Sequence, residues 1–294
     1  MGLRVAFLVT LIMICFAANS VITRYLVLAS GVSPFLVTLI RFVSGLLVLM
    51  ALAGVQPANF RPARMSPKYL LGGLFLGVYA FSISYGYLFI PVAAGTLVFY
   101  TAVVMTMVTY SIINDKEQLT RRLGLGLLLG LFGVITITFS KISAVTLPGV
   151  LLMIATGASW GLYSAYGRKF DVAFSYTFNS FLILGVFAVV VGLALSYFHQ
   201  LTLASLSPFD LGLALYMGMA STALSYVVWN RTMKKIPAYL GGIVQVTVPV
   251  LASIMGIIFL REMITASLVL GGVLVISGIY LVQFKHNSLR QSDG

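Results

Sequence analysis

Long apolar runs separated by short polar joints dominate the chain. Each run has about the 20 residues that an α-helix needs to cross roughly 30 Å of hydrocarbon. Proline marks most of the joints, as in Ser33-Pro34 and Ile90-Pro91, where one helix ends or the next begins. The pattern predicts ten membrane-spanning helices, over residues 3–24, 33–54, 67–89, 92–113, 121–140, 146–168, 174–197, 207–230, 237–260 and 265–284.

Composition supports an all-α integral membrane protein. Of the 294 residues, 60% are hydrophobic and only 8% are charged, with a mean hydropathy of +1.07. Ten spans with short joints leave no room for a separate soluble domain, so the lipid bilayer is the expected surroundings. The single cysteine, Cys15, excludes an internal disulfide and a CxxC metal site. We take the first apolar run as a retained span, although its start resembles a signal peptide.

The net charge of +12 comes from basic residues in the joints, not from a basic stripe of the kind that binds nucleic acid. With the N-terminus in the cytoplasm, 14 of the 18 Lys and Arg residues lie on the cytoplasmic side and three on the outer side. The remaining one, Arg41, lies within a span. By the positive-inside rule we expect both termini in the cytoplasm.

The two halves of the chain repeat. A shift of 145 residues places Lys116-Glu117 on Arg261-Glu262, and a shift of 146 places Ile90 on Ile236. We expect a first unit over residues 1–144 and a second over 145–294, each with five helices. Because five is odd, the second unit must be inverted in the membrane. Inverted repeats typically enclose a central cavity with a substrate site near the midplane.

At this point the chain resembles a known family. Trp160-Gly161 precedes Arg168-Lys169, and a basic–Glu pair closes the predicted fourth and ninth spans. These features, with the 5+5 arrangement, resemble the EamA family of the drug/metabolite transporter superfamily, and within it the bacterial YddG-type aromatic amino acid exporters. The resemblance implies a bacterial inner-membrane protein with helices around a central cavity and the fifth and tenth helices at one side.

The stretch from Tyr79 to Thr101 is unusually rich in tyrosines and hydroxyls for a hairpin without charge. Buried hydroxyls need partners, from other helices or from a cavity. Aromatic faces suit a flat ring or an ammonium group. Interfacial belts, helix packing and amide bridges between helices are the alternatives. The candidate substrate-binding residues lie inside predicted spans: Tyr79, Tyr100, Trp160, Tyr163, Asn19 and Gln245.

Charged groups are nearly absent from the interiors of the predicted spans, where Arg41 is the only one. No Asp or Glu lies in the core of a span, so a proton relay through embedded carboxylates has no obvious members. We expect gradient-driven transport without a dedicated coupling ion. Arg41 either meets a solute carboxylate or relieves its burial by snorkelling towards the helix end.

These observations favour a transporter of small organic solutes working by alternating access. Aromatic and other neutral amino acids come first, mainly as an implication of the resemblance. Efflux of drugs or cationic metabolites is the alternative, and an open channel ranks below both. A membrane-embedded enzyme ranks low because the sequence has no HExxH, GxSxG or His/Asp cluster. We expect no catalytic residue, metal, cofactor or nucleic acid, and the oligomeric state stays open, a monomer included.

Overall fold

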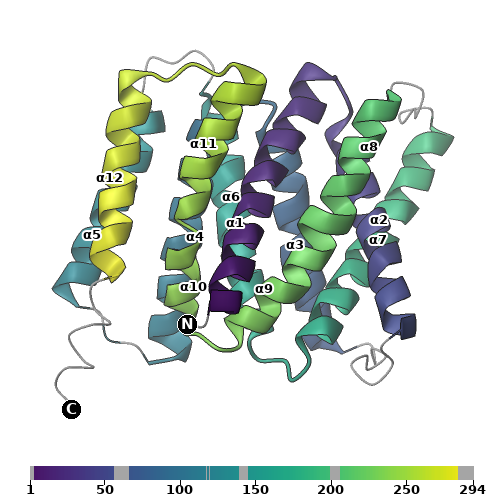
Figure 1. Cartoon of the computed structure of the whole chain (residues 1–294), viewed down its shortest axis with the longest axis horizontal. Coiled ribbons are helices and arrows are strands. Elements are labelled where there is room, and N and C mark those ends of the chain that lie inside the picture. Colours follow the sequence, from purple (N-terminus) through teal and green to yellow (C-terminus); the bar gives the residue numbers. More distant parts are fainter. Residues whose placement is uncertain are drawn as a thin grey trace.

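The structure, a computed structural model, describes residues 3–55, 66–116, 118, 120–138, 145–198 and 206–283. Within these ranges the chain forms helices and no strands (Figure 1). The first part holds α1 (Leu3–Arg24) with a π-helical continuation η1 (Tyr25–Ala29), α2 (Pro34–Val55), α3 (Pro67–Gly86), α4 (Val92–Asn114) and α5 (Arg121–Thr138). The second holds α6 (Leu147–Gly167), α7 (Ala173–Tyr197), α8 (Pro208–Tyr216), η3 (Met217–Leu224), α9 (Ser225–Met233), α10 (Ala238–Val244), α11 (Thr247–Leu260) and α12 (Ala266–Gln283).

Eight helical segments are long and apolar enough to cross a membrane. Two shorter apolar stretches, Gly124–Ile137 in α5 and Ala266–Gly278 in α12, accompany them. An all-helical protein with multiple membrane spans is therefore confirmed for the described residues, whereas the count of ten stays a prediction. The predicted boundaries agree closely with the helices, except that the first helix continues to Ala29 and the ninth predicted span is divided into α10 and α11.

Three helices begin with the same local chemistry. Ser66, Thr146 and Ser207 each accept a hydrogen bond from a backbone N–H of the first turn, and a proline follows one or two residues later. The hydroxyl satisfies one of the free amides at the helix start, and proline has no amide to satisfy. These short motifs set where α3, α6 and α8 enter the bundle.

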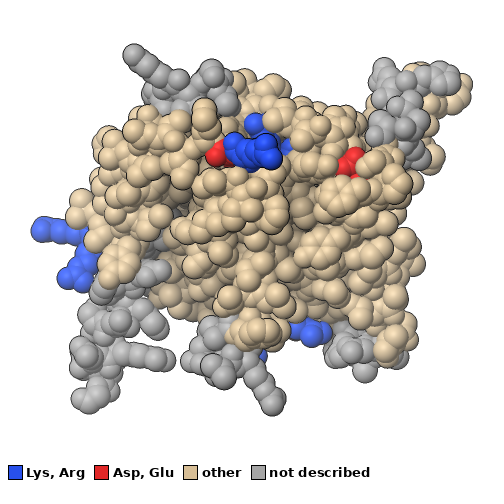
Figure 2. Space-filling view, turned by 45° about the horizontal axis from the view of Figure 1, so that its top comes forward, with Lys and Arg blue, Asp and Glu red and all other residues tan. Residues whose placement is uncertain are grey.

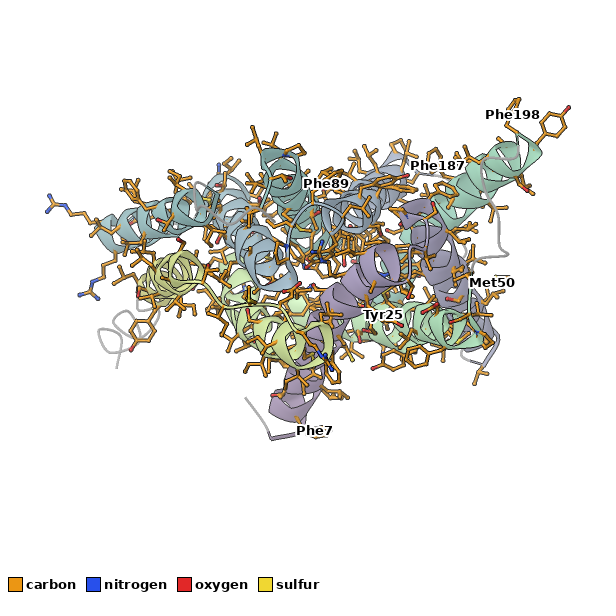
Figure 3. All side chains as sticks on the ribbon, turned by 90° about the horizontal axis from the view of Figure 1, so that it is seen from above. Phe7, Tyr25, Met50, Phe89, Phe187 and Phe198 are labelled. Carbon is orange, nitrogen blue, oxygen red and sulfur yellow. The ribbon has the colours of Figure 1, made fainter. Side chains whose placement is uncertain are left out.

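The helices form an elongated body when viewed along their axes (Figure 3). At one end α5 packs against α12, as the resemblance implies for the fifth and tenth spans. Among the eight candidate spans α4 is the most enclosed, with 83% of an 18-residue apolar segment buried inside the bundle, and it packs against α6, α10 and α11. The core lies around α1, α3, α4, α6 and α9, away from the α5–α12 pair.

The outer surface suits lipid. Large apolar side chains such as Phe7, Met50 and Phe187 point outward from the rim of the body and are more than half exposed (Figure 3). Figure 2 shows a broad face without Lys, Arg, Asp or Glu across its middle, with charged side chains towards its edges. This distribution is typical of a bundle surrounded by hydrocarbon.

Two helical irregularities border the core. Proline at position 249 cannot donate to the carbonyl of Gln245, four residues earlier, and the helix breaks there between α10 and α11. Between α8 and α9 the chain widens into the π-helical η3, an irregularity that is common at functional sites. Gly218 of η3 lies so close to α2 that an added Cβ would meet the Arg41 carbonyl oxygen at 2.4 Å. Only glycine allows this approach without displacement.

Candidate functional site

A small cavity lies at the centre of the bundle. Its volume is about 10 Å³, at the lower limit of the space that one water molecule needs. Five elements, α1, α3, α4, α6 and α9, contribute its wall. The wall consists of Phe16, Asn19, Ser20, Tyr79, Ile83, Phe99, Tyr100, Trp160 and Tyr226.

Aromatic rings from distant parts of the chain meet on this wall. The ring centroids of Trp160 and Tyr226 are 4.6 Å apart, and those of Tyr79 and Trp160 are 5.2 Å apart. Phe16 meets Trp160 edge-on at 5.4 Å and Tyr226 at 5.8 Å. These separations are those of favourable aromatic pairs. The cluster of Phe16, Tyr79, Trp160 and Tyr226, which we call the aromatic cluster, surrounds the small cavity and leaves little free space.

Hydrogen bonds behind the wall fix the orientation of the rings. Trp160 Nε1 donates to Gln245 Oε1 at 2.7 Å, which joins α6 to the break between α10 and α11. Tyr163 stacks on Trp160 with centroids 5.5 Å apart, and its hydroxyl accepts from Asn230 Nδ2 at 3.1 Å. In a dry interior each of these bonds avoids the cost of an unpaired polar group.

Arg41 lies beside the aromatic cluster and is 1% exposed. Its Nε donates to Thr222 Oγ1 at 2.7 Å, and its Nη2 donates to the hydroxyls of Tyr79 and Tyr226, each at 3.0 Å. The Tyr226 hydroxyl donates to the Tyr79 hydroxyl at 2.9 Å. Arg41, Tyr79, Thr222 and Tyr226, here called the arginine clasp, join α2, α3, η3 and α9.

The structure brings the six predicted site residues together. Tyr79, Tyr100, Trp160 and Asn19 line the cavity. The other two, Tyr163 and Gln245, are fully buried one layer behind it and contact Trp160. Four of the six residues thus form the wall of the cavity, and the other two support Trp160 from behind. Solute contact at any of them stays a prediction.

Sequence reasoning did not single out Phe99, Ser20 or Ile83, and it did not include Tyr226 among the six candidates, although Tyr226 lies in the segment that the repeat pairs with Tyr79–Thr101. A signal existed for Tyr226, because it follows Tyr79 by 147 residues, close to the offset of about 145 between the two halves. The other three are ordinary membrane-helix residues without a distinguishing pattern. The snorkelling alternative for Arg41 is wrong, since its side chain is buried between helices.

An ion pair lies towards each end of the bundle. At the end where α3 and α11 finish, Arg24 Nε is 3.7 Å from Glu262 Oε1, and Arg24 also donates to the Tyr87 carbonyl oxygen. The same carboxylate accepts from the backbone N–H of Val92 at 2.9 Å and thereby caps α4. At the other end, Arg168 Nη1 is 2.7 Å from Asp115 Oδ2.

A larger pocket of about 400 Å³ opens at the Arg168–Asp115 end. Two lysines, an aspartate and three aromatic rings stand on its wall, which suits a small polar organic molecule in size and chemistry. The residues lining it are Ser66, Lys68, Tyr69, Tyr166, Lys169, Phe170, Asp171, Val172 and Ser175.

The described residues contain no group of three or more His, Cys, Asp or Glu placed to hold a metal ion. The buried polar side chains of the described residues are mainly hydroxyls and amides, with the indole N–H groups of Trp160 and Trp229, the Arg41 guanidinium and the Asp210 carboxylate at the start of α8. The arrangement suits binding of an organic solute by stacking and hydrogen bonding.

Comparisons with known proteins identify the family of the chain. The model of the EamA-like transporter family matches residues 3–139 and again residues 147–284. An uncharacterized protein of Pseudomonas aeruginosa is 32% identical over 279 residues, covering 95% of this chain and 94% of its own. The uncharacterized transporter YoaV of Bacillus subtilis is 26% identical over 264 residues, covering 86% and 88% of the two chains.

A solved crystal structure superposes with a TM-score of 0.64 at 22% identity, covering 94% of this chain and 97% of that chain. At this identity the likeness supports the fold alone. The family matches, which together span nearly the whole sequence, identify the activity class. The chain belongs to the EamA-like transporter family and is a multi-pass membrane transporter.

Proposed function

We propose that the protein exports small organic solutes, aromatic and other neutral amino acids first, across a bacterial inner membrane. The observation that carries the proposal is the aromatic cluster, which surrounds a cavity in the buried centre of the bundle. Stacking and cation–π contacts with such rings contribute about 0.5–2 kcal/mol each. An amino acid offers both an apolar side chain and an ammonium group to them.

The proposed architecture has ten spans in two inverted five-helix units, residues 1–144 and 145–294. Two findings support it: the family model matches once in each half, and α1 begins at the end of the bundle where α12 finishes (Figure 1). Helices α5 and α12 would complete the count despite their shorter apolar stretches. The excess of Lys and Arg supports cytoplasmic placement of that end and of both termini.

Transport would proceed by alternating access between the two ends. The small cavity corresponds to a closed state, and each end carries one ion pair that must separate before solute passes. The pocket beside Arg168 and Asp115 would receive solute from the cytoplasm. Among the described residues the acidic groups lie at helix ends, so no embedded carboxylate offers a coupling proton.

Efflux of drugs or cationic metabolites is the second candidate, because the aromatic cluster also suits organic cations. Flux in proteoliposomes containing the pure protein separates the two. We expect saturable flux of labelled aromatic amino acids and weak flux of a cationic dye. The reverse preference would favour the second candidate, and flux of both without saturation or competition would indicate a pore. Accumulation driven by a proton gradient alone would contradict the absence of proton coupling.

A further inference from the structure

Within the described part of the chain, the arginine clasp contains a buried positive charge without a negative partner. The ion pairs of the described residues join Arg24 to Glu262 and Arg168 to Asp115, and neither involves Arg41. Its three hydrogen-bond acceptors, on Thr222, Tyr79 and Tyr226, are all neutral hydroxyls. An unpaired charge is costly away from water, and in membrane proteins such a group typically marks a substrate or ion pathway.

One nitrogen of the Arg41 guanidinium has no hydrogen-bond partner. Nε is engaged by Thr222, whereas Nη1 is buried without a hydrogen-bond partner and Nη2 contacts only the two tyrosine hydroxyls. The Nη1–Nη2 edge of a guanidinium can bind a carboxylate through both of its oxygens. In Arg41 the Nη1 N–H groups are free for such an anion, and the Nη2 N–H groups become free when the Tyr79 and Tyr226 hydroxyls move away.

The tyrosine pair supplies a further donor. Each hydroxyl accepts a hydrogen bond from Nη2, and one hydroxyl donates to the other. One of the two hydroxyl protons is used in the hydrogen bond between the tyrosines. The other hydroxyl proton has no acceptor within the clasp. Both residues also line the central cavity, so they link Arg41 to the space where solute would lie.

An acceptor lies on the same cavity wall. Asn19 is 2% exposed, and its Nδ2 donates to the Ser221 carbonyl oxygen at 3.0 Å. Its Oδ1 is buried and has no partner. The site thus combines an unpaired cationic donor with an unpaired neutral acceptor, and aromatic rings line the same cavity. This combination matches a carboxylate and an ammonium group on one small molecule.

We propose that Arg41, with the hydroxyls of Tyr79 and Tyr226, forms the carboxylate-binding subsite of the transporter, and that Asn19 Oδ1 receives the solute's ammonium group. This inference rests on the proposed function and narrows it: transported solutes carry a carboxylate, and cationic drugs are disfavoured by the unpaired charge of Arg41. Because the cavity measures about 10 Å³, the carboxylate enters only after Tyr79 and Tyr226 separate.

Competition on the unmodified protein tests the subsite directly. Labelled L-phenylalanine is the reporter in proteoliposomes, with 3-phenylpropionate, phenylalaninamide and phenethylamine as competitors. The two compounds without a carboxylate should compete about 10- to 100-fold more weakly than phenylalanine, the range expected for a lost hydrogen bond to a charged group. Equal competition by phenylalaninamide and phenylalanine would overturn the assignment of Arg41.

Variants then locate the effect. Arg41→Gln should remove the preference for carboxylates, so that amide and acid compete equally, and Arg41→Lys should retain part of it. Arg121→Gln, at the exposed start of α5, makes the same charge change outside the core and should leave the preference unchanged. If Arg41→Gln fails to fold, the competition on the unmodified protein still decides.

A binding measurement separates this inference from the proposed function. In detergent, 3-phenylpropionate should raise the Tm of the protein and 3-phenylpropionamide should not. Absence of phenylalanine flux together with stabilisation by the carboxylate would refute amino acid export and retain the anion site. Equal stabilisation by both compounds, or by neither, would overturn the anion site.

Discussion

Trp160 shows how one side chain organises the site. Its ring contacts three others of the aromatic cluster, Phe16, Tyr79 and Tyr226. Its Nε1 hydrogen bond to Gln245 joins the cluster to the break between α10 and α11. A change at this residue therefore alters both the wall of the cavity and the contact between two helices.

Replacing Trp160 with Phe should reduce both stability and transport. The variant leaves Gln245 Oε1 without its donor in a dry interior, which costs about 1–3 kcal/mol of the free energy of unfolding. Trp229→Phe is the matched control, because it similarly deprives Ser164 Oγ of a donor but lies outside the cavity wall. Tm in detergent should fall for both, and kcat/KM for amino acid flux should fall further for Trp160→Phe. Equal kinetic effects would contradict a role of Trp160 in solute binding.

At the scale of elements, α4 and α6 form a closely packed pair. Gly157 of α6 belongs to a GxxxG pair with Gly161, and a Cβ added to it would lie 2.2 Å from the Phe99 carbonyl oxygen of α4. The backbone carbonyl of Phe99 cannot move aside as a flexible side chain could. The two helices are thus expected to move as one unit when the cavity opens.

Gly157→Ala should therefore destabilise the protein by forcing α4 and α6 apart. Overpacking of this kind typically costs about 1–3 kcal/mol. Gly212→Ala in α8 is the control, since nothing lies within 4 Å of its added Cβ and alanine is the better helix former. Thermal unfolding in detergent should show a lower Tm for the first variant and an unchanged or slightly higher Tm for the second. A tolerated Gly157→Ala would contradict the close contact.

For the whole molecule, the proposed alternating access assigns the ion pairs at the two ends the role of stabilising a closed state from opposite sides. The pair at Glu262 also caps α4, whereas the pair at Asp115 joins the ends of α4 and α6. Alternating access requires that one end opens while the other stays closed. Weakening either pair should therefore change which side of the membrane reaches the cavity.

A cysteine in the cavity wall can report this opening. In a variant in which Cys15 is replaced by Ser, the substitution Ile83→Cys supplies the only thiol of the protein. Glu262→Gln should accelerate its labelling by an impermeant maleimide from the Glu262 side, and Asp115→Asn from the other side. A loss of about 1 kcal/mol changes a two-state population roughly fivefold. Right-side-out and inverted vesicles provide reciprocal controls, and equal acceleration from both sides would contradict separate gates.

The sequence predicts much of the fold because a bilayer imposes simple rules. Apolar length sets the spans, and proline marks their ends, which is why most boundaries agree with the structure. The break at Gln245 was foreseeable from Pro249, four residues later. Four of the six candidate residues reach the cavity wall because polar groups inside a span, whether on an aromatic ring or on an amide, need a protein environment.

The arginine clasp was beyond sequence reasoning. It depends on the close approach of η3 to α2 at Gly218 and on the π-helical widening that orients Thr222 and Tyr226. Both arise from contacts between residues about 180 positions apart, and no local pattern specifies them. The sequence could show that Arg41 needed a partner, but it could not show which groups are within reach.

The small volume of the central cavity has a consequence for the energy stored across the membrane. Protons cross a bilayer through connected water molecules or through chains of titratable groups, and either would discharge the gradient that powers the cell. A space of about 10 Å³ holds at most about one water molecule, and the acidic groups of the described residues lie at helix ends. In this state the transporter is expected to conduct no protons, so many copies could be present in the membrane without dissipating its proton gradient.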